Sequence, residues 1–281
     1  QSTTTVTPAT MWTLDTWGEY LIACSNADGK LYEWQLDFAT PTVAAAIANA
    51  PTGCNAVMVT AERFVFALGA GGNPRKVQWS DQEDNTSWTP STLNQAGDFE
   101  LATPGTLMAG KRVRGLNLMW TDVDCHSAAY IGQPFVYGFE KIGSGCGLIS
   151  PQSVAIVSDA TAIWMSRTGF WMYDGSVKPL ASDVGDYVYR NINNSQASKT
   201  YAVHKGEFGE VWWFYASVDS NEIDSYVLYN YREGHWNIGL LARTAGTGRG
   251  AFDKPILVSV DGFLYEHEVG YDYDSEVLFC E

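Results

Sequence analysis

The sequence has few cysteines, no long apolar run and none of the common nucleotide-binding or hydrolase motifs. Its five cysteines lie far apart and form no C-x-x-C pair, so a zinc site is not expected. Buried free thiols, in a chain that folds in a reducing cytosol, are the favoured interpretation. No apolar run approaches the roughly 20 residues of a membrane helix. No G-x-S-x-G, P-loop or dinucleotide fingerprint is present. The five thiols are Cys24, Cys54, Cys125, Cys146 and Cys280.

Basic residues are also scarce. The 281 residues include 17 Lys and Arg against 32 Asp and Glu, which gives a net charge of −15. Phosphate binding needs clustered Lys and Arg, so the surface as a whole is not expected to hold nucleic acid. Two interpretations stay open: the charge keeps the protein soluble, or it repels a polyanion that must pass without sticking.

What the sequence does contain is a recurring phrase, a turn through Gly followed by a strand rich in aromatic residues. It occurs as 28–34 (DGKLYEW), as 261–267 (DGFLYEH) and, in a variant, as 168–173 (TGFWMY). The Asp-Gly pairs at 28–29, 174–175 and 261–262 are typical of two-residue hairpin loops, because Gly accepts positive φ easily. Repetition of this kind is the sequence signature of a repeat architecture.

Short strands are predicted along most of the chain, and no long helix is. Ala44–Ala50, bounded by prolines, is interpreted as an outer strand or a linker. Runs rich in β-branched and aromatic residues and bounded by turn residues mark the strands. They are Glu19–Ala23, Phe64–Leu68, Leu116–Thr121, Val154–Val157, Ala162–Met165, Val211–Ala216, Tyr226–Tyr231 and Ile256–Val260.

Aligning the aromatic strands gives six units of roughly 47 residues, within the range of propeller blades. We therefore predict an all-β fold, a six-bladed β-propeller, over a β-sandwich pair or a β-helix. Residues 81–94 and 182–199 are interpreted as insertions that project from the ring. The aligned positions are Tyr32, Val77, Val136, Trp171, Leu228 and Tyr265.

Polar clusters were considered as sites of chemistry. Asp122 and Asp124 would share one face of a strand, where two carboxylates could act as the acid and base of a glycosidase or bind a cation. An exposed strand end explains the two residues as well. Residues 219–224 resemble half of a calcium loop without its Gly and distal Glu. The arginines that a sialidase-type site requires have no recognisable spacing; they are Arg63, Arg112, Arg114, Arg167 and Arg232.

Other candidate residues are given structural roles. Trp79 and Trp88 are expected to clamp the polar loop between them by stacking on core residues, with sugar stacking as the alternative. The histidines lie far apart and form no metal-binding pattern. No catalytic, cofactor-binding or metal-binding residue is therefore predicted. The histidines are His126, His204, His235 and His267.

Several phrases together resemble the tail nozzle, or tail hub, proteins of short-tailed bacteriophages. The most distinctive is Val77-Gln78-Trp79-Ser80-Asp81 leading to Trp88-Thr89-Pro90. Similar phrases occur at 14–24, 31–34, 97–99, 167–171 and 264–268, so the resemblance covers most of the chain. Its specificity is moderate, because propellers in general share this pattern of aromatic residues and Gly.

The resemblance implies a structural virion protein and not an enzyme. It implies a homo-oligomeric ring, a hexamer, that lies below the portal and adaptor in the virion tail. The tail would be assembled in the host cytoplasm, and tail fibres or spikes would be further partners. The ring would continue the DNA channel, retain the packaged genome and take part in ejection, without specific DNA binding, cofactor or membrane insertion. An acidic lumen would reduce sticking to phosphate, and the insertions are expected to make subunit contacts.

Two other function classes stay open, a carbohydrate-binding or sialidase-like glycoside-hydrolysing propeller and a cellular scaffold propeller. The chain begins at Gln1 without Met and ends at Phe279-Cys280-Glu281, within a strand-like stretch. We therefore expect residues 1–281 to form a single β-propeller domain that is a fragment of a longer chain.

Overall fold

The computed structural model describes residues 10–37, 39–40, 42–250, 252–269, 272–273 and 276–277. The chain forms two units, residues 1–185 and 186–281. Six antiparallel sheets of three or four strands, with strands adjacent in the order of the chain, make up the described part. The predicted fold class is confirmed: the protein is an all-β, six-bladed β-propeller. That residues 1–281 act as a single domain stays a prediction.

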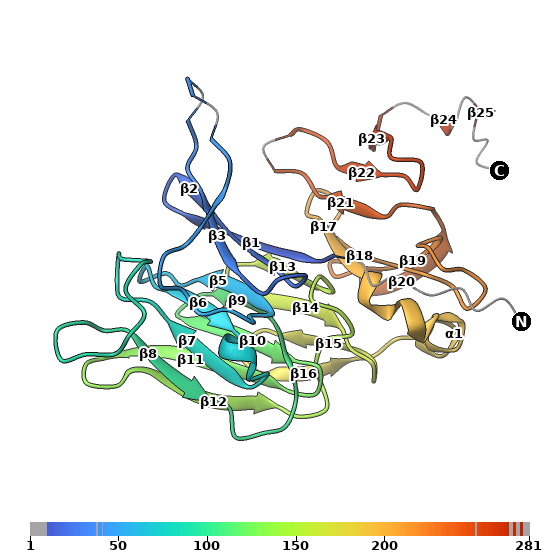
Figure 1. The fold of residues 1–281 in the computed structure, drawn as a ribbon. Coiled ribbons are helices and arrows are strands. Elements are labelled where there is room, and N and C mark those ends of the chain that lie inside the picture. The colour runs from blue at the N-terminus through green and yellow to red at the C-terminus, as the bar shows by residue number, and fades with distance from the viewer. Residues whose placement is uncertain are drawn as a thin grey trace, which may run out of the picture. The chain divides into compact units, whose positions relative to one another are not determined.

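The first unit contains four of the sheets, each with four strands (Figure 1). The first sheet has β1 (Trp12–Trp17), β2 (Tyr20–Ser25), β3 (Leu31–Trp34) and β4 (Ala45–Ala46). The second has β5 (Ala56–Val59), β6 (Val65–Leu68), β7 (Lys76–Trp79) and β8 (Gly97–Glu100), with η1 (Ala70–Gly72) between β6 and β7. The third has β9 (Leu107–Val113), β10 (Leu116–Thr121), β11 (Cys125–Gly132) and β12 (Val136–Gly143). The fourth has β13 (Val154–Ser158), β14 (Thr161–Met165), β15 (Phe170–Tyr173) and β16 (Val177–Leu180).

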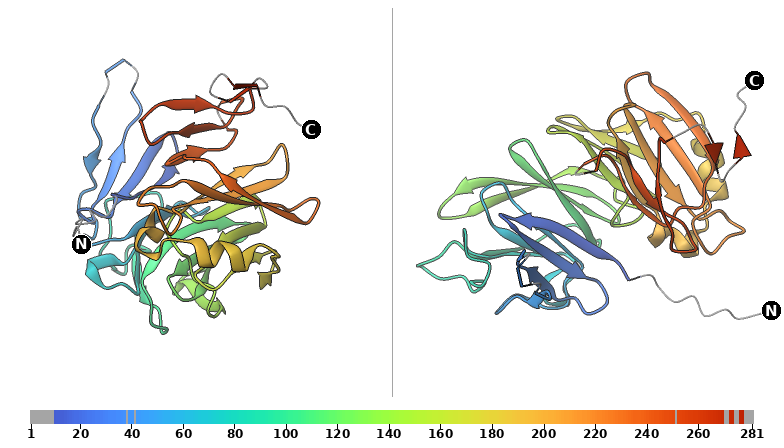
Figure 2. Two further views of the ribbon diagram at one scale, coloured as in Figure 1. Left: turned by 90° about the vertical axis from the view of Figure 1, so that its right-hand side faces the viewer. Right: turned by 90° about the horizontal axis from the view of Figure 1, so that it is seen from above.

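The second unit contains the other two blades and a short hairpin (Figure 2). Helices α1 (Gly185–Asn191) and η2 (Asn194–Lys199) precede the fifth sheet of β17 (Tyr201–Lys205), β18 (Glu210–Tyr215), β19 (Ser225–Asn230) and β20 (His235–Leu240). The sixth sheet has β21 (Ala245–Thr247), β22 (Ile256–Val258) and β23 (Leu264–Glu266), and the hairpin has β24 (Asp272–Tyr273) and β25 (Glu276–Val277). No helix in the described ranges is long and apolar enough to cross a membrane.

The predicted strands are confirmed. All eight coincide with a strand to within two residues at each end, and Leu116–Thr121 matches β10 fully. The stretch Ala44–Ala50 contains the short outer strand β4, which pairs with β3. Runs of β-branched and aromatic residues bounded by turn residues therefore located the strands well. The predicted strand-like end at Phe279–Glu281, with Cys280, lies outside the described residues.

The blade alignment was wrong at one of its six positions. Five lie on the third strand of their sheet, but Val136 lies on the fourth strand, β12. The third strand there is β11, whose middle is Ser127-Ala128-Ala129 and whose first aromatic residue is Tyr130. Because the alignment followed aromatic residues, it selected the next strand, with Tyr137. Part of the uneven spacing between Val77 and Val136 comes from this shift.

The Asp-Gly turns need their glycines, although the loops are longer than predicted. Gly29, Gly175 and Gly262 have φ of 63°, 114° and 82°, a region that side chains disfavour. A Cβ on Gly29 would also lie 2.6 Å from the Cα of Gly53. However, Tyr173 pairs with Val177 and Val258 pairs with Leu264, so these loops have three and five residues.

The core lies between neighbouring sheets and not within any one of them. Strand β6 shows how: Val65 and Ala67 pack in the apolar layer shared with the first sheet, and Phe66 and Leu68 pack in the layer shared with the third. Alternate residues of a strand point to opposite faces, so both faces of this sheet are covered. In the second unit, Tyr201 and Phe214 form a similar layer with Leu257 of the sixth sheet.

The two insertions differ from each other. The loop 81–94 is held by its tryptophans as predicted: Trp88 Nε1 donates to Asn85 O at 2.6 Å, and Trp79 Nε1 donates to Gln95 O at 2.8 Å. Both rings are buried, which excludes them from sugar stacking. Residues 182–199, expected to project, instead form α1 and η2, with Val188 and Ile192 buried. Val188 lies on α1, and Ile192 follows the helix and forms an isolated β-bridge with Ser217.

We expect Trp79→Ala to lower the free energy of unfolding by about 3–5 kcal/mol, measured by urea denaturation, because it empties a large buried site. Trp79 contacts Phe66, Tyr137 and Phe139 at ring-centroid distances of 5.7 to 5.9 Å. Trp171→Ala serves as the comparison. Its ring is only partly buried, so the substitution should cost less. Equal costs for the two substitutions would contradict this description of the core.

Candidate functional site

The carboxylate pair considered as a catalytic site is part of a turn. Asp122 and Asp124 follow β10 and do not lie on a strand. Asp122 Oδ1 accepts the backbone N–H of Thr106 at 2.6 Å, and Asp124 Oδ1 accepts that of Gly145 at 3.1 Å. Asp124 is buried and lies 3.9 Å from Lys141 Nζ. Each carboxylate therefore fixes a different backbone segment, which is a structural role.

The five arginines do not converge on one pocket. Arg63 pairs with Glu83 at 3.0 Å and lies over the Trp17 ring. Arg112 pairs with Asp15 at 3.0 Å, and Arg114 pairs with exposed Asp159 at 3.4 Å. Arg232, in the second unit, donates to the carbonyl groups of Gly206 and Glu207. The arrangement that a sialidase-type site requires is not assembled among these contacts; Arg167 is exposed.

The half calcium loop is closed by its own hydrogen bonds. Both carboxylate oxygens of Asp224 accept from Ser217, the backbone N–H at 2.8 Å and the hydroxyl at 2.6 Å. No group of three or more His, Cys, Asp and Glu side chains that could hold a metal ion occurs in the described part of the chain. Residues 219–224 therefore act as a hairpin loop.

The described cysteines are buried free thiols, as predicted. Burial raises the pKa of Cys24 and Cys54 to about 12 and that of Cys146 to about 11. Burial also raises the pKa of Cys125 well above its ordinary value. Thiols held in the protonated form are poor nucleophiles and poor metal ligands, so these residues contribute packing. Cys280 lies outside the described residues.

Three histidines are partly or fully buried, and each has a single hydrogen-bond partner. His126 Nε2 contacts Thr103 Oγ1 at 3.1 Å, and His204 Nε2 contacts Tyr231 Oη at 3.0 Å. His267 Nε2 accepts from Arg243 Nε at 3.1 Å. Burial lowers the pKa of all three, and for His267, where Arg243 and Lys205 add to the effect, the pKa falls to about 4. These rings are neutral near pH 7.

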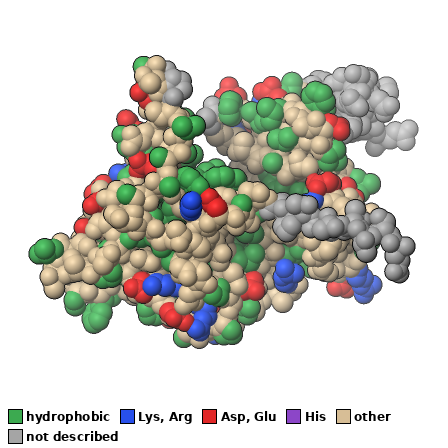
Figure 3. Space-filling model, viewed as in Figure 1, with side chains coloured by type: hydrophobic (Ala, Val, Ile, Leu, Met, Phe, Trp, Pro, Cys, Tyr) green, Lys and Arg blue, Asp and Glu red, His purple; other side chains and the backbone are tan. Residues whose placement is uncertain are grey.

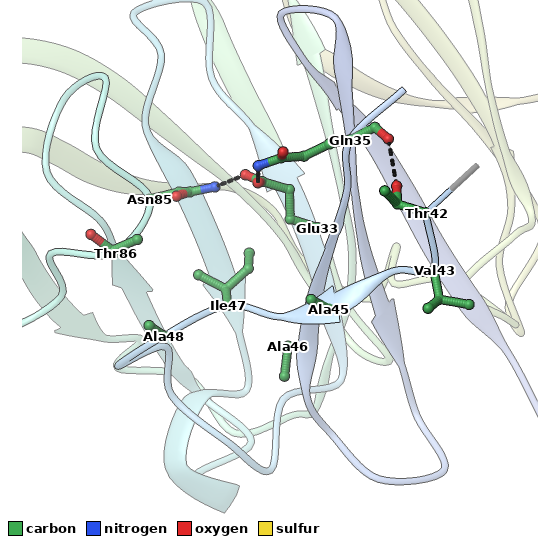
Figure 4. A pocket seen from close by; sticks show the side chains of 10 residues that line it. All are labelled: Glu33, Gln35, Thr42, Val43, Ala45, Ala46, Ile47, Ala48, Asn85 and Thr86. Atoms are coloured by element: carbon green, nitrogen blue, oxygen red, sulfur yellow. Dashed lines mark hydrogen bonds between the residues drawn. The ribbon is translucent and has the colours of Figure 1, made fainter. Parts of the chain in front are cut away.

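A cavity of about 340 Å³ lies between β3–β4 and the loop 81–94 of the next blade (Figure 4). Glu33 accepts from the side-chain amide of Asn85 and, at 2.8 Å, from that of Gln35. The opposite wall is apolar, made of three alanines and Ile47 between positions 45 and 48. Glu33 is the only ionisable group among the lining residues, so the cavity has no acid–base pair for hydrolysis.

A larger groove, of about 690 Å³, runs between the outer strands β12 and β16 of the third and fourth blades. Its walls are mixed: Phe139, Ile142 and Val177 are apolar, whereas Glu140 and Lys141 are charged. The groove is shallow surface relief between two blade edges, and its side chains show no catalytic arrangement.

The first strands of the sheets in the first unit lie next to one another and carry both signs of charge. Asp15 of β1 accepts the backbone N–H of Val59 of β5 at 2.8 Å and pairs with Arg112 of β9. Lys111 is on the same strand as Arg112, and burial lowers its pKa. The cavity between these strands measures only about 110 Å³. The surface of these strands is therefore not acidic throughout, and the cavity between them is too small for a DNA duplex.

Large exposed apolar side chains gather at the tips of two neighbouring loops in the first unit. Tyr130 and Ile131, 39% and 56% exposed, lie at the end of β11, Phe135, 74% exposed, lies in the turn to β12, and Leu93, 96% exposed, lies in the loop 81–96. The loops touch where Tyr130 Oη donates to Gln95 Oε1 at 3.4 Å. Figure 3 shows hydrophobic side chains at this edge of the molecule. We call these four residues the hairpin-tip surface.

Sequence reasoning missed the hairpin-tip surface. It named Val136 as an aligned strand position and did not consider the turn before it. The signal available in the sequence was Gly132-Gln133-Pro134, a turn-forming triplet with a bulky apolar residue on each side. Apolar residues that flank a turn, where no strand partner can cover them, indicate an exposed apolar tip.

Comparison with known proteins supports the fold and leaves the function open. No family model matches the chain, and no curated protein matches it significantly. Among solved structures, the β-propeller domain of Swd1 from Myceliophteria thermophila aligns with a TM-score of 0.56 at 10% identity, covering 89% of this chain and 79% of that one. A virginiamycin B lyase from Staphylococcus aureus aligns with a TM-score of 0.54 at 8% identity, covering 94% and 85%. At such identities the likeness is one of fold alone.

We expect the stability of the protein to fall as the pH decreases from about 6.5 to about 4, partly because of His267. In this window the unfolded chain gains a proton at His267 that the folded chain does not, so acid favours unfolding. His267→Gln should reduce the pH dependence of the melting temperature, whereas His235→Gln, at an exposed site, should not. An NMR titration of the His267 ring with a midpoint near 6.5 would contradict this assignment.

Proposed function

We propose that this chain is the β-propeller part of a nozzle subunit in the tail of a short-tailed bacteriophage. In this proposal six copies form a ring below the portal and adaptor and continue the DNA channel. The ring retains packaged DNA and takes part in its ejection. The phrases at 77–90, 167–171 and 264–268 support the assignment through their resemblance to that family.

The single observation that carries an assembly role is the hairpin-tip surface. Ile131 and Phe135 of the β11–β12 hairpin and Leu93 of the neighbouring loop are large apolar side chains that are more than half exposed. Exposed large apolar side chains on neighbouring segments are typical of interaction sites in soluble proteins. In a ring of identical subunits each copy would bury this surface against the next copy, and the aromatic residues Tyr130 and Phe135 are of the type enriched at such contacts.

The route of DNA follows from size and charge. The cavity of about 110 Å³ between the first strands is far too small for duplex DNA, so the lumen in this proposal lies between subunits. The net charge of −15 would weaken phosphate contacts along that lumen. The protein then acts as a conduit that makes no sequence-specific contact with DNA. Its partners in this proposal are the adaptor, the portal and tail fibres or spikes. It is assembled in the host cytoplasm and then forms part of the virion tail. This role needs no catalytic group or cofactor.

A carbohydrate-active propeller is the second candidate, and it finds less support. Glycoside hydrolysis requires two carboxylates facing one substrate. Asp122 and Asp124 each hold a backbone N–H instead, and Trp79 and Trp88 are buried. Binding on a glycan array together with hydrolysis of a fluorogenic glycoside would favour this alternative.

The assembly proposal is tested with the full-length protein and its adaptor, imaged by negative-stain electron microscopy. We expect six-fold rings for the natural sequence. The double substitution Ile131→Asp and Phe135→Asp should abolish rings while leaving the circular dichroism spectrum unchanged, since both side chains are exposed and their burial would be lost with the contact.

Val43→Asp is the matched control. Val43 is 93% exposed on the connection between β3 and β4, away from the hairpin-tip surface, so this variant should still form rings. Monomers of the natural sequence in the presence of adaptor would contradict the proposed function. Rings that persist in the Ile131 and Phe135 variant would contradict the assigned contact surface.

A further inference from the structure

The cavity between the first and second blades contains a carboxylate that has no role in the proposed function. This cavity, of about 340 Å³, lies within the first unit, between β3–β4 and the loop 81–94 (Figure 4). Glu33 is the only ionisable group among its described lining residues. We call it the Glu33 cavity. The proposed ring does not depend on this cavity.

Two neutral amide groups hold the Glu33 carboxylate beside the cavity. Asn85 Nδ2 donates to Oε2, and Gln35 Nε2 donates to Oε1 at 2.8 Å. Asn85 is 8% exposed, and its backbone carbonyl accepts from the buried indole of Trp88, so this amide has a fixed position. Figure 4 shows the carboxylate between the two amides, with the side chain of Ile47 pointing toward the same space. The carboxylate is therefore positioned before any ligand arrives.

The negative charge of Glu33 has no counter-charge within the described part of the chain. Both of its hydrogen-bond donors are neutral amides, and it forms no ion pair with a described residue. A carboxylate can accept about four hydrogen bonds, two at each oxygen, so each oxygen has room for a further donor. Glu33 is also partly buried, and a charge partly withdrawn from water without a counter-ion costs free energy. The cavity therefore favours a cation.

The other walls of the cavity indicate which kind of cation fits. A divalent metal ion requires several oxygen ligands, whereas no group of three or more metal-binding side chains occurs among the described residues. The wall opposite the loop 81–94 is apolar, with three alanines and Ile47 between positions 45 and 48. An ammonium group has N–H donors for the free positions of the carboxylate, and a short alkyl chain attached to it can lie against the apolar wall.

We propose that the Glu33 cavity binds a small primary alkylamine in its protonated form. The ammonium group donates to the Glu33 carboxylate, and the alkyl chain contacts Ala45 and Ile47. Ala45 is on the same face of the sheet as Glu33, because the two residues are directly opposite each other on β4 and β3. A single carboxylate beside an apolar wall, in a cavity of this size, is typical of a site for a small organic ligand.

The test uses the full chain and three probes at constant ionic strength: n-butylammonium chloride, n-butanol and tetramethylammonium chloride. Binding is followed by NMR, through the methyl shifts of Ile47. We expect saturable binding of butylammonium. Butanol, which has no charge, and tetramethylammonium, which has no N–H donor, should bind at least about tenfold more weakly. Equal binding of tetramethylammonium would indicate general attraction to an acidic surface and would overturn the proposal.

Ala45→Leu is the decisive variant, because it fills the space beside Glu33 and keeps the carboxylate and both amides. Ala45 is exposed, so the melting temperature should not fall, whereas the affinity for butylammonium should fall at least about tenfold. Ala44→Leu is the matched control, since Ala44 is exposed but does not line the cavity, and it should bind butylammonium as the natural sequence does.

Glu33→Gln removes the charge at nearly constant size and provides a second variant. It should also bind butylammonium at least about tenfold more weakly, with an unchanged circular dichroism spectrum. Absence of saturable butylammonium binding to the natural sequence would overturn the proposal. Unchanged affinity in the Ala45 or the Glu33 variant would overturn it as well.

Discussion

The structure depends on the burial of apolar side chains between neighbouring sheets. Strand β10 makes this clearest, because consecutive residues serve opposite faces: Met119 packs in the layer with the second sheet, and Trp120 packs against Trp164 of the fourth at a ring-centroid distance of 5.4 Å. All three side chains are fully buried. A single four-stranded sheet would leave one such face in water, so each blade in this unit is stable only because its neighbour covers it.

This constraint determines where function can lie. Because the strands are committed to the layers between blades, side chains that can meet a partner are found on the connections. The hairpin-tip surface lies on the loop after β7 and at the β11–β12 turn, including the last residues of β11. Carboxylates that resemble catalytic groups in the sequence, such as Asp122 and Asp124, are used instead to hold turns.

The sequence predicted the features that depend on local pattern. Runs of β-branched and aromatic residues between turn residues located strands such as β10, and the repeated aromatic phrases gave the six blades. The tryptophans of the loop 81–94 were expected to stack on core residues, and in the structure their indole N–H groups also hold the loop. It could not predict features that depend on contacts between distant residues. Arg243 and His267 meet only because β22 and β23 bring the end of the sixth sheet back to the segment after β20. The error at Val136 has a local origin, since the middle of β11 is Ser127-Ala128-Ala129 and carries no aromatic residue.

The most direct test of the account is hydrogen–deuterium exchange of the chain carrying Trp120→Ala. If blades stabilise one another through the layers between them, amide protection should fall in β14, on the far side of the Trp120–Trp164 contact, as well as in β10. Protection lost in β10 and its own sheet alone, with β14 unchanged, would show that each sheet is stable by itself and would contradict the account.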